Sequence, residues 1–241
     1  MDGTKYGGYH SYEKFGLLRS ARPVISDPEV KTHIVDNPGA NGDIDLTTSL
    51  TGVPQYKNRT ITESYIVRGD RRQREHLPSR LYSHFDGSRE YIIIDNDPGY
   101  MWLGRSLVKG VDKSSETHMK LNIVSDVEPF KYERFSSIDD WEWDYLNFET
   151  GIIREYKDIY VDGICEIEII GTKRPSIPVF HLSNVTSDIS VEYYDGVLDR
   201  TVLANLSKRE DTSDIIIREG INRLSFYGVG YVSIEYRGGI L

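Results

Sequence analysis

Cysteine is almost absent from the sequence, which has one, Cys165, among 241 residues. A single cysteine cannot form a disulfide within the chain, and it excludes a zinc site built from cysteines. Cys165 lies in an alternating segment, residues 164–169, where it shares one side of an expected strand with Ile167 and Ile169. We therefore interpret Cys165 as a small apolar core residue and not as a reactive thiol.

Long apolar runs are also missing. No run approaches the roughly 18 residues that a membrane span needs, and residues 1–5 lead into no apolar signal-peptide core. We expect a protein that is made and kept in the cytoplasm unless lysis releases it, with no membrane partner.

Recognisable catalytic and cofactor motifs are lacking as well. The six histidines are scattered and none belongs to an H-E-x-x-H pair, and no G-x-x-x-x-G-K or G-x-G-x-x-G element occurs. Residues 228–230 (GVG) separate two strand-like runs, so they predict a hairpin turn. We expect no cofactor and no enzymatic activity.

Two pairs of aspartates with i, i+2 spacing are the nearest approach to a metal site. Asp43 and Asp45, like Asp95 and Asp97, would share one side of a strand, as calcium ligands could. Each pair adjoins good turn chemistry, Asn-Gly before the first and Pro-Gly after the second. We interpret both as turn residues and predict no metal site.

The net charge of −9 is unevenly distributed. Residues 1–134 contain 19 basic and 19 acidic side chains, whereas residues 135–241 contain 10 basic and 19 acidic ones. The asymmetry predicts two domains and argues against nucleic-acid binding by the second. The only basic cluster, Arg68, Arg71, Arg72 and Arg74, lacks interleaved aromatics, and a solvated face or a subunit contact explains it better than nucleic acid does.

Abundant strand formers define the fold class. Seventeen tyrosines, with many Ile and Val, favour strands over helices. Turn residues separate strand candidates at residues 31–36, 43–49, 59–67, 91–95, 100–108 and 118–127, and then at 151–156, 159–170, 176–182, 190–194, 215–219, 222–227 and 231–237. The short, evenly spaced strands of the second set predict a β-sandwich.

One helix is expected near residues 71–86. Leu77, Leu81 and Phe85 recur at i, i+4 and i+8, and Gly87 provides a stop. Pro78 either kinks this helix or belongs to its first turn. We favour a helix of about three turns or fewer.

Residues 136–150 are expected to join the two domains. Residues 136–140 (SSIDD) have the composition of a turn, and an aromatic segment with Trp141, Trp143, Tyr145 and Phe148 follows. We predict a β domain over 1–135, an aromatic linker or domain seam over 136–150, and a β-sandwich over 151–241. Aromatic side chains also stack on sugars, so Trp141, Trp143 and Tyr145 define an alternative, a carbohydrate-binding module for host cell-wall saccharides.

A second hairpin is predicted over residues 38–47 (PGANGDIDLT). It contains two turn-forming pairs, Pro-Gly and Asn-Gly, and glycine adopts the positive φ that such turns require. The strand candidates on both sides make it a connection between paired strands. Its candidate functional residues are Pro38, Gly39, Asn41, Gly42, Asp43 and Asp45.

Several stretches together carry a family resemblance: residues 8–18 (GYHSYEKFGLL), 30–32 (VKT), 38–47, 56–60 (YKNRT), 97–100 (DPGY), 147–151 (NFETG), 174–178 (RPSIP) and 236–239 (YRGG). In order and spacing they resemble the distal tail protein (Dit) family of long-tailed bacteriophages. The resemblance spans nearly the whole chain.

This resemblance implies a tail-tube-like β-sandwich with one helix that forms a hexameric ring, followed by a galectin-like β-sandwich. It implies a structural protein of the virion tail tip. Its partners would be five further copies of itself, the tail tube protein, and a tail-associated lysin, fibre or receptor-binding protein, around a channel for the genome. In this setting the 38–47 hairpin becomes a candidate interlocking arm between subunits, because edge strands seek partners. A third class, a β-sandwich glycosidase, offers no acid–base pair that the sequence can identify.

Overall fold

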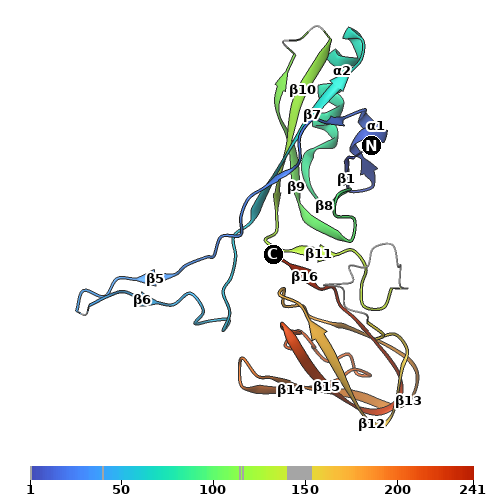
Figure 1. Cartoon of the computed structure of the whole chain (residues 1–241). Helices are drawn as coiled ribbons and strands as arrows, with labels where there is room; N and C mark the ends of the chain where they lie inside the picture. Colours follow the sequence, from blue (N-terminus) through green and yellow to red (C-terminus); the bar gives the residue numbers. More distant parts are fainter. Residues whose placement is uncertain (1, 40, 114, 116, 140–153) are drawn as a thin grey trace. The chain divides into compact units, whose positions relative to one another are not determined.

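The computed structural model describes residues 2–39, 41–113, 115, 117–139 and 154–241. The chain divides into two compact units, Met1–Lys131 and Tyr132–Leu241 (Figure 1). Nearly all regular structure in the described residues is antiparallel strand, so the predicted mainly β class is confirmed. Residues 132–135, which the sequence assigned to the first domain, group with the second unit.

The first unit is built on one antiparallel sheet with the strand order β2-β1-β8-β9-β10-β7-β3, and β4 also pairs with β7. The bounds are β1 Thr4–Tyr6, β2 Tyr9–His10, β3 Leu18–Arg19, β4 Val24–Ile25, β7 Arg59–Arg68, β8 Asp86–Ile94, β9 Tyr100–Asp112 and β10 His118–Val127. Strands β7 and β10 pair along their whole length, and alternate side chains of each enter the core.

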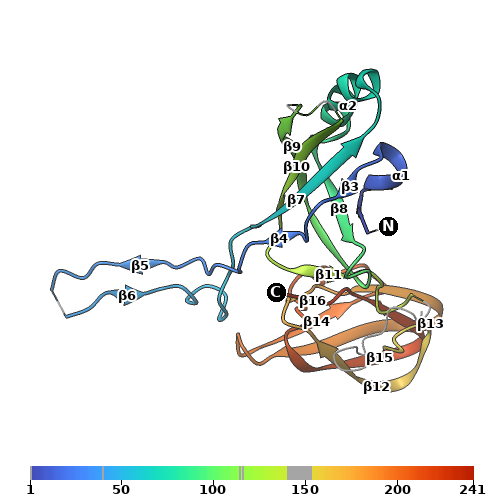
Figure 2. The same ribbon diagram turned by 45° about the horizontal axis from the view of Figure 1, so that its top comes forward.

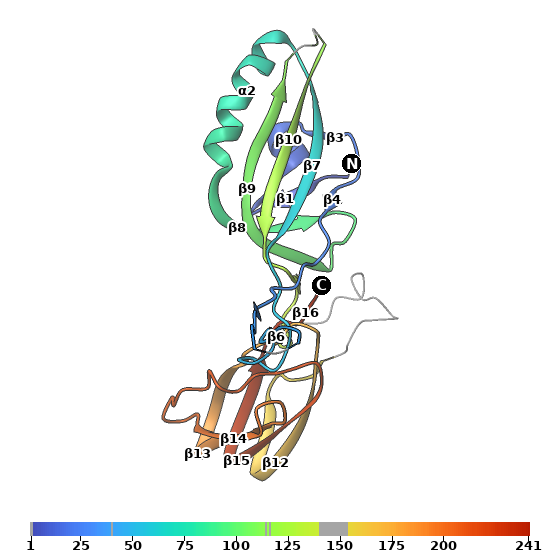
Figure 3. The same cartoon turned by 90° about the vertical axis from the view of Figure 1, so that its left-hand side faces the viewer.

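Helix α2 (Arg71–His84) lies alongside this sheet (Figure 3) and buries Leu77 and Leu81, with Phe85 directly after it. Its 14 residues make about four turns, so the expectation of three turns or fewer is wrong. Asp70 caps the helix, because its Oδ1 accepts a hydrogen bond from the Gln73 amide at 2.7 Å. This cap and the buried apolar face keep the helix continuous through Pro78, although Pro78 cannot donate a backbone hydrogen bond.

A second helix, α1 (Ser11–Phe15), is present where the sequence predicted none. His10 Nδ1 accepts a hydrogen bond from the Tyr12 amide at 3.3 Å, and Gly16 ends the helix at φ 67°. Five residues are too few for a helical period to show in the sequence. The first unit therefore has two helices, not one, in its described part.

The second unit contains a sheet with the strand order β12-β15-β13-β14, and β11 pairs with β16. The bounds are β11 Lys131–Glu133, β12 Ile159–Gly171, β13 Val179–Asp195, β14 Arg200–Asn205, β15 Gly220–Glu235 and β16 Gly239–Ile240. Cys165 is half-buried against this unit's core, and Ile169 on the same side of β12 is fully buried.

Some predicted strands of this unit are wrong in extent. The candidates at 176–182 and 190–194 merge into β13, and those at 222–227 and 231–237 merge into β15. The segment 215–219 forms only an isolated bridge from Ile217 to Ser176. Residues 154–156 form no strand, and the rest of that candidate lies outside the described residues.

The merging of the last two strands overturns the predicted hairpin at residues 228–230. Gly228 and Gly230 have φ of 132° and 156° and lie within β15 opposite β12. A Cβ on Gly228 would lie 2.4 Å from the backbone oxygen of Asp188 on β13. These glycines therefore permit a close approach of two strands instead of a chain reversal.

Candidate subunit interface

The predicted hairpin forms and leaves the sheet of the first unit as a two-stranded arm, residues 29–57 (Figures 1 and 2). Its strands are β5 (Ile34–Val35) and β6 (Ile44–Asp45). At its base Val30 bridges Tyr56, and the Tyr56 ring meets Phe130 edge-on with centroids 5.7 Å apart. The arm is thus fixed where it joins the sheet.

The candidate hairpin residues cluster at the tip of the arm. Pro38, Gly39, Asn41 and Gly42 lie in the connection, Asp43 precedes β6 and Asp45 belongs to it. Gly42 adopts φ 85°, as the Asn-Gly signal requires. Ala40 lies outside the described residues.

Asp45 has a local structural partner. Its Oδ1 accepts a hydrogen bond from the Thr47 amide at 2.8 Å, and hydrogen bonds to the Thr47 side chain and backbone hold the Asp45 pKa below its usual value. Among the described residues, no three His, Cys, Asp or Glu side chains form a group suited to a metal ion. Asp45 therefore acts in this structure as a turn residue.

The arm packs against nothing else in the described chain. No described residue from 21 to 58 is buried, and Leu50 is 93% exposed. Val35 pairs with Ile44, and alternation adds Leu46 to the same face. All three are exposed. The arm therefore presents an apolar face that is not buried by any part of the chain that the structure describes.

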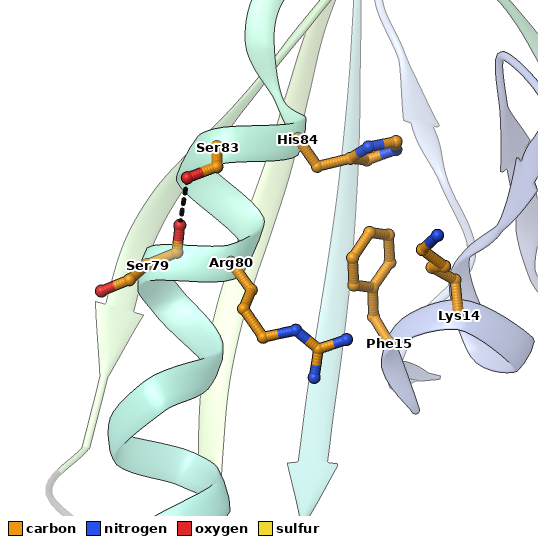
Figure 4. A pocket seen from close by; sticks show the side chains of 6 residues that line it. All are labelled: Lys14, Phe15, Ser79, Arg80, Ser83 and His84. Carbon is orange, nitrogen blue, oxygen red and sulfur yellow. Dashed lines mark hydrogen bonds between the residues drawn. The ribbon is translucent and has the colours of Figure 1, made fainter.

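A second surface lies between the two helices of the first unit. We call it the α1–α2 groove, and it is lined by Lys14, Phe15, Gly16, Val67, Arg68, Arg72, Gln73, His76, Leu77, Ser79, Arg80, Ser83 and His84. Figure 4 shows Lys14 of α1 and Arg80 of α2 on either side of the Phe15 ring. Of the basic cluster seen in the sequence, Arg68 and Arg72 line this groove, whereas Arg74 donates to the Ser115 carbonyl at 2.9 Å.

The groove is basic, and none of the described residues provides an anionic partner for its arginines. Within the described part of the chain, Arg68, Arg72 and Arg80 make no ion pair. Burial and the nearby Lys14 ammonium lower the pKa of His84, which favours the neutral imidazole. The His84 Nε2 is buried and has no hydrogen-bond partner among the described residues.

Sequence reasoning identified only part of this groove. Arg72, His76 and Arg80 recur at i, i+4 and i+8, the spacing of one helix face. This spacing could have predicted that the three side chains lie on the same side of α2. Lys14 could not be assigned to the groove, because it belongs to an unpredicted helix far away in the sequence.

The predicted domain seam, Trp141, Trp143, Tyr145 and Phe148, lies outside the described residues. It stays a prediction, and so does the sugar-stacking alternative that uses the same side chains. No helix in the described chain is long and apolar enough to cross a membrane.

Neither the protein-family models nor the curated protein sequences contain a match to the chain. Its structure is similar to the crystal structure of the Dit protein (gp19.1) of phage SPP1, with a TM-score of 0.59, 13% sequence identity and full coverage of both chains. That protein is described as a paradigm of the hub adsorption apparatus in phages that infect Gram-positive bacteria. The chain therefore has a Dit-like fold, as its sequence resemblance implied.

Proposed function

We propose that this protein is a structural hub at the distal end of a phage tail. Six copies form a ring that joins the tail tube to the tail-associated lysin or baseplate and leaves a channel for the genome. The Dit-like fold supports the tail role. The protein acts by assembly and not by catalysis, and it is located at the virion tail tip.

The observation that carries the ring proposal is the unpartnered arm. An extended hairpin with Val35, Ile44 and Leu46 exposed on one face leaves 38–47% of each residue's surface in water, and burying apolar surface stabilises by about 25 cal/mol per Å². A cyclic ring of identical subunits uses a heterologous interface, in which one patch meets a different patch of the next copy. A projecting arm is suited to such a contact.

The charge distribution is compatible with a ring built by the first unit. Residues 1–131 contain 18 basic and 18 acidic side chains, so six copies accumulate no net charge. The whole excess of nine negative charges belongs to the second unit, for which we propose contacts with the adhesion device and no nucleic-acid binding.

Removal of the arm tests this role. We replace residues 31–55 with a Gly-Ser-Gly linker that joins Val30 to Tyr56, two residues already bridged at the arm base. The free energy of unfolding should change by less than about 1 kcal/mol, because none of the deleted residues that the structure describes is buried. The mass measured by light scattering should be that of six copies for the intact protein and of one copy for the deletion variant. Rings of unchanged size without the arm would contradict the proposal.

A further inference from the structure

We propose that the arm of one copy docks in the α1–α2 groove of the neighbouring copy. The inference rests on the proposed ring and identifies the two surfaces that meet in it.

The two surfaces have opposite charge. Residues 34–46, the tip of the arm, include Asp36, Asp43 and Asp45 and no Lys or Arg. The groove is lined by four cations, Lys14, Arg68, Arg72 and Arg80, and by no acidic side chain. The three negative charges of the tip and the four positive charges of the groove are complementary. Such complementarity steers two proteins together and orients their contact.

The groove gathers four like charges. Arg72 and Arg80 follow one face of α2, and Lys14 and Arg68 line the same groove, so these cations repel one another. The described residues provide no carboxylate to neutralise Arg68, Arg72 or Arg80. Aspartates from a second copy would relieve this repulsion.

Both surfaces have apolar parts as well. On the arm, Ile34 pairs with Asp45, so it shares a face with the aspartates, and it is exposed. The lining of the groove includes the apolar side chains of Phe15 and Leu77. Apolar side chains within a polar rim are the usual arrangement of a protein interface.

The arm and the groove lie on different sides of the first unit. In Figures 1 and 2 the arm leaves the sheet on the side away from α1. The arm base is held by the Val30–Tyr56 bridge and the contact of Tyr56 with Phe130, so the arm does not fold back into its own groove. A donor surface and an acceptor surface on different sides of a subunit are what head-to-tail ring closure requires.

Charge reversal on the two surfaces tests the docking. Arg72→Glu with Arg80→Glu should weaken self-association at least tenfold, and Asp36→Lys with Asp43→Lys should do the same. Asp45 is left unchanged because it caps the turn at Thr47. The combination of all four changes should restore association to within about threefold of the wild type, because the charges are exchanged and the pairing is kept.

The matched control is Arg71→Glu with Lys109→Glu. It has the same charge change on two exposed residues that do not line the groove, one of them on the same helix. This control should associate like the wild type, as measured by mass photometry and analytical ultracentrifugation. Groove variants that associate no worse than the control would overturn the docking.

Site-specific photocrosslinking shows where the arm lies in the wild-type assembly. With p-benzoylphenylalanine at position 34, on the same face as Asp45, and a mixture of isotopically labelled and unlabelled chains, crosslinks should join the arm of one chain to residues 11–16 or 68–84 of another. Rings whose crosslinks lie elsewhere would overturn the docking and leave the ring intact. A protein that neither crosslinks between chains nor forms rings would instead contradict the proposed function.

Discussion

At the scale of single residues, a buried ion pair fixes the N-terminal strands to the sheet of the first unit. Glu63 on β7 is fully buried, and its Oε1 accepts from Arg19 Nη2 at 3.0 Å and from Thr4 Oγ1 at 2.6 Å. The Tyr6 hydroxyl donates to Glu63 Oε2. Burial, followed by the Glu63 charge, raises the Tyr6 pKa well above its usual value. This network could not be predicted from the sequence, because its members come from three separate strands.

Arg19→Met should destabilise the protein by about 3–5 kcal/mol, because it leaves the Glu63 carboxylate buried without its cation. Urea unfolding monitored by circular dichroism gives the free energy. Arg22→Met is the control, since Arg22 is exposed, and it should change stability by less than about 0.5 kcal/mol. Equal stability of the two variants would contradict this role for Arg19.

Glu90 on β8 should make stability depend on pH. Burial, and next the nearby Asp86 charge, raise its pKa from 4.5 to about 7. Between these two values the folded state binds more protons than the unfolded state, so the Glu90 contribution to stability falls as pH rises. Because the side chain is only half-buried, solvent reduces the effect to about 1 kcal/mol.

Glu90→Gln removes this titration. The variant should be more stable than the wild type by about 1 kcal/mol at pH 8, and this advantage should disappear near pH 4.5. Urea unfolding across this pH range measures the difference. A stability difference that is the same at pH 5 and pH 8 would show that Glu90 titrates normally.

At the scale of helices and strands, sequence signals were correct where the conformation depends on residues close together in the chain. The Asn-Gly signal at residues 41–42 correctly gave a chain reversal between β5 and β6, because the turn depends on the φ of one glycine. The apolar spacing of Leu77, Leu81 and Phe85 correctly gave α2. The limit of about three turns was too short, because Pro78 was expected to kink the helix or to begin it, whereas the helix continues through Pro78.

The errors arise where distant strands decide the conformation. Residues 228–230 have the composition of a turn, yet β12 and β13 pair with both flanking runs and keep them in one strand. The α1–α2 groove is also a tertiary feature, since it combines Lys14 with Arg68, Arg72 and Arg80. Periodicity within one segment cannot predict either result.

Gly228→Ala should destabilise the protein by about 2–4 kcal/mol. The new methyl group would meet the Asp188 carbonyl, and the φ of 132° would strain any side chain. Gly196→Ala is the control, because its Cβ would lie no nearer than 3.7 Å to Tyr194. Thermal unfolding compares the two, and an unaffected Gly228→Ala variant would argue for a strand that tolerates a side chain there.

At the scale of the whole molecule, the two units differ in net charge and in surface features. The first is electrically neutral and carries both the arm and the α1–α2 groove, whereas the second carries the acidic excess. Self-association is therefore a property that we assign to the first unit.

The oligomeric state of the purified full-length protein tests the central claim most directly. Mass photometry combined with negative-stain electron microscopy should find particles of six times 27.7 kDa and rings with six-fold symmetry around an open centre. A single species of 27.7 kDa that persists at high protein concentration, with no rings on the grid, would contradict the account.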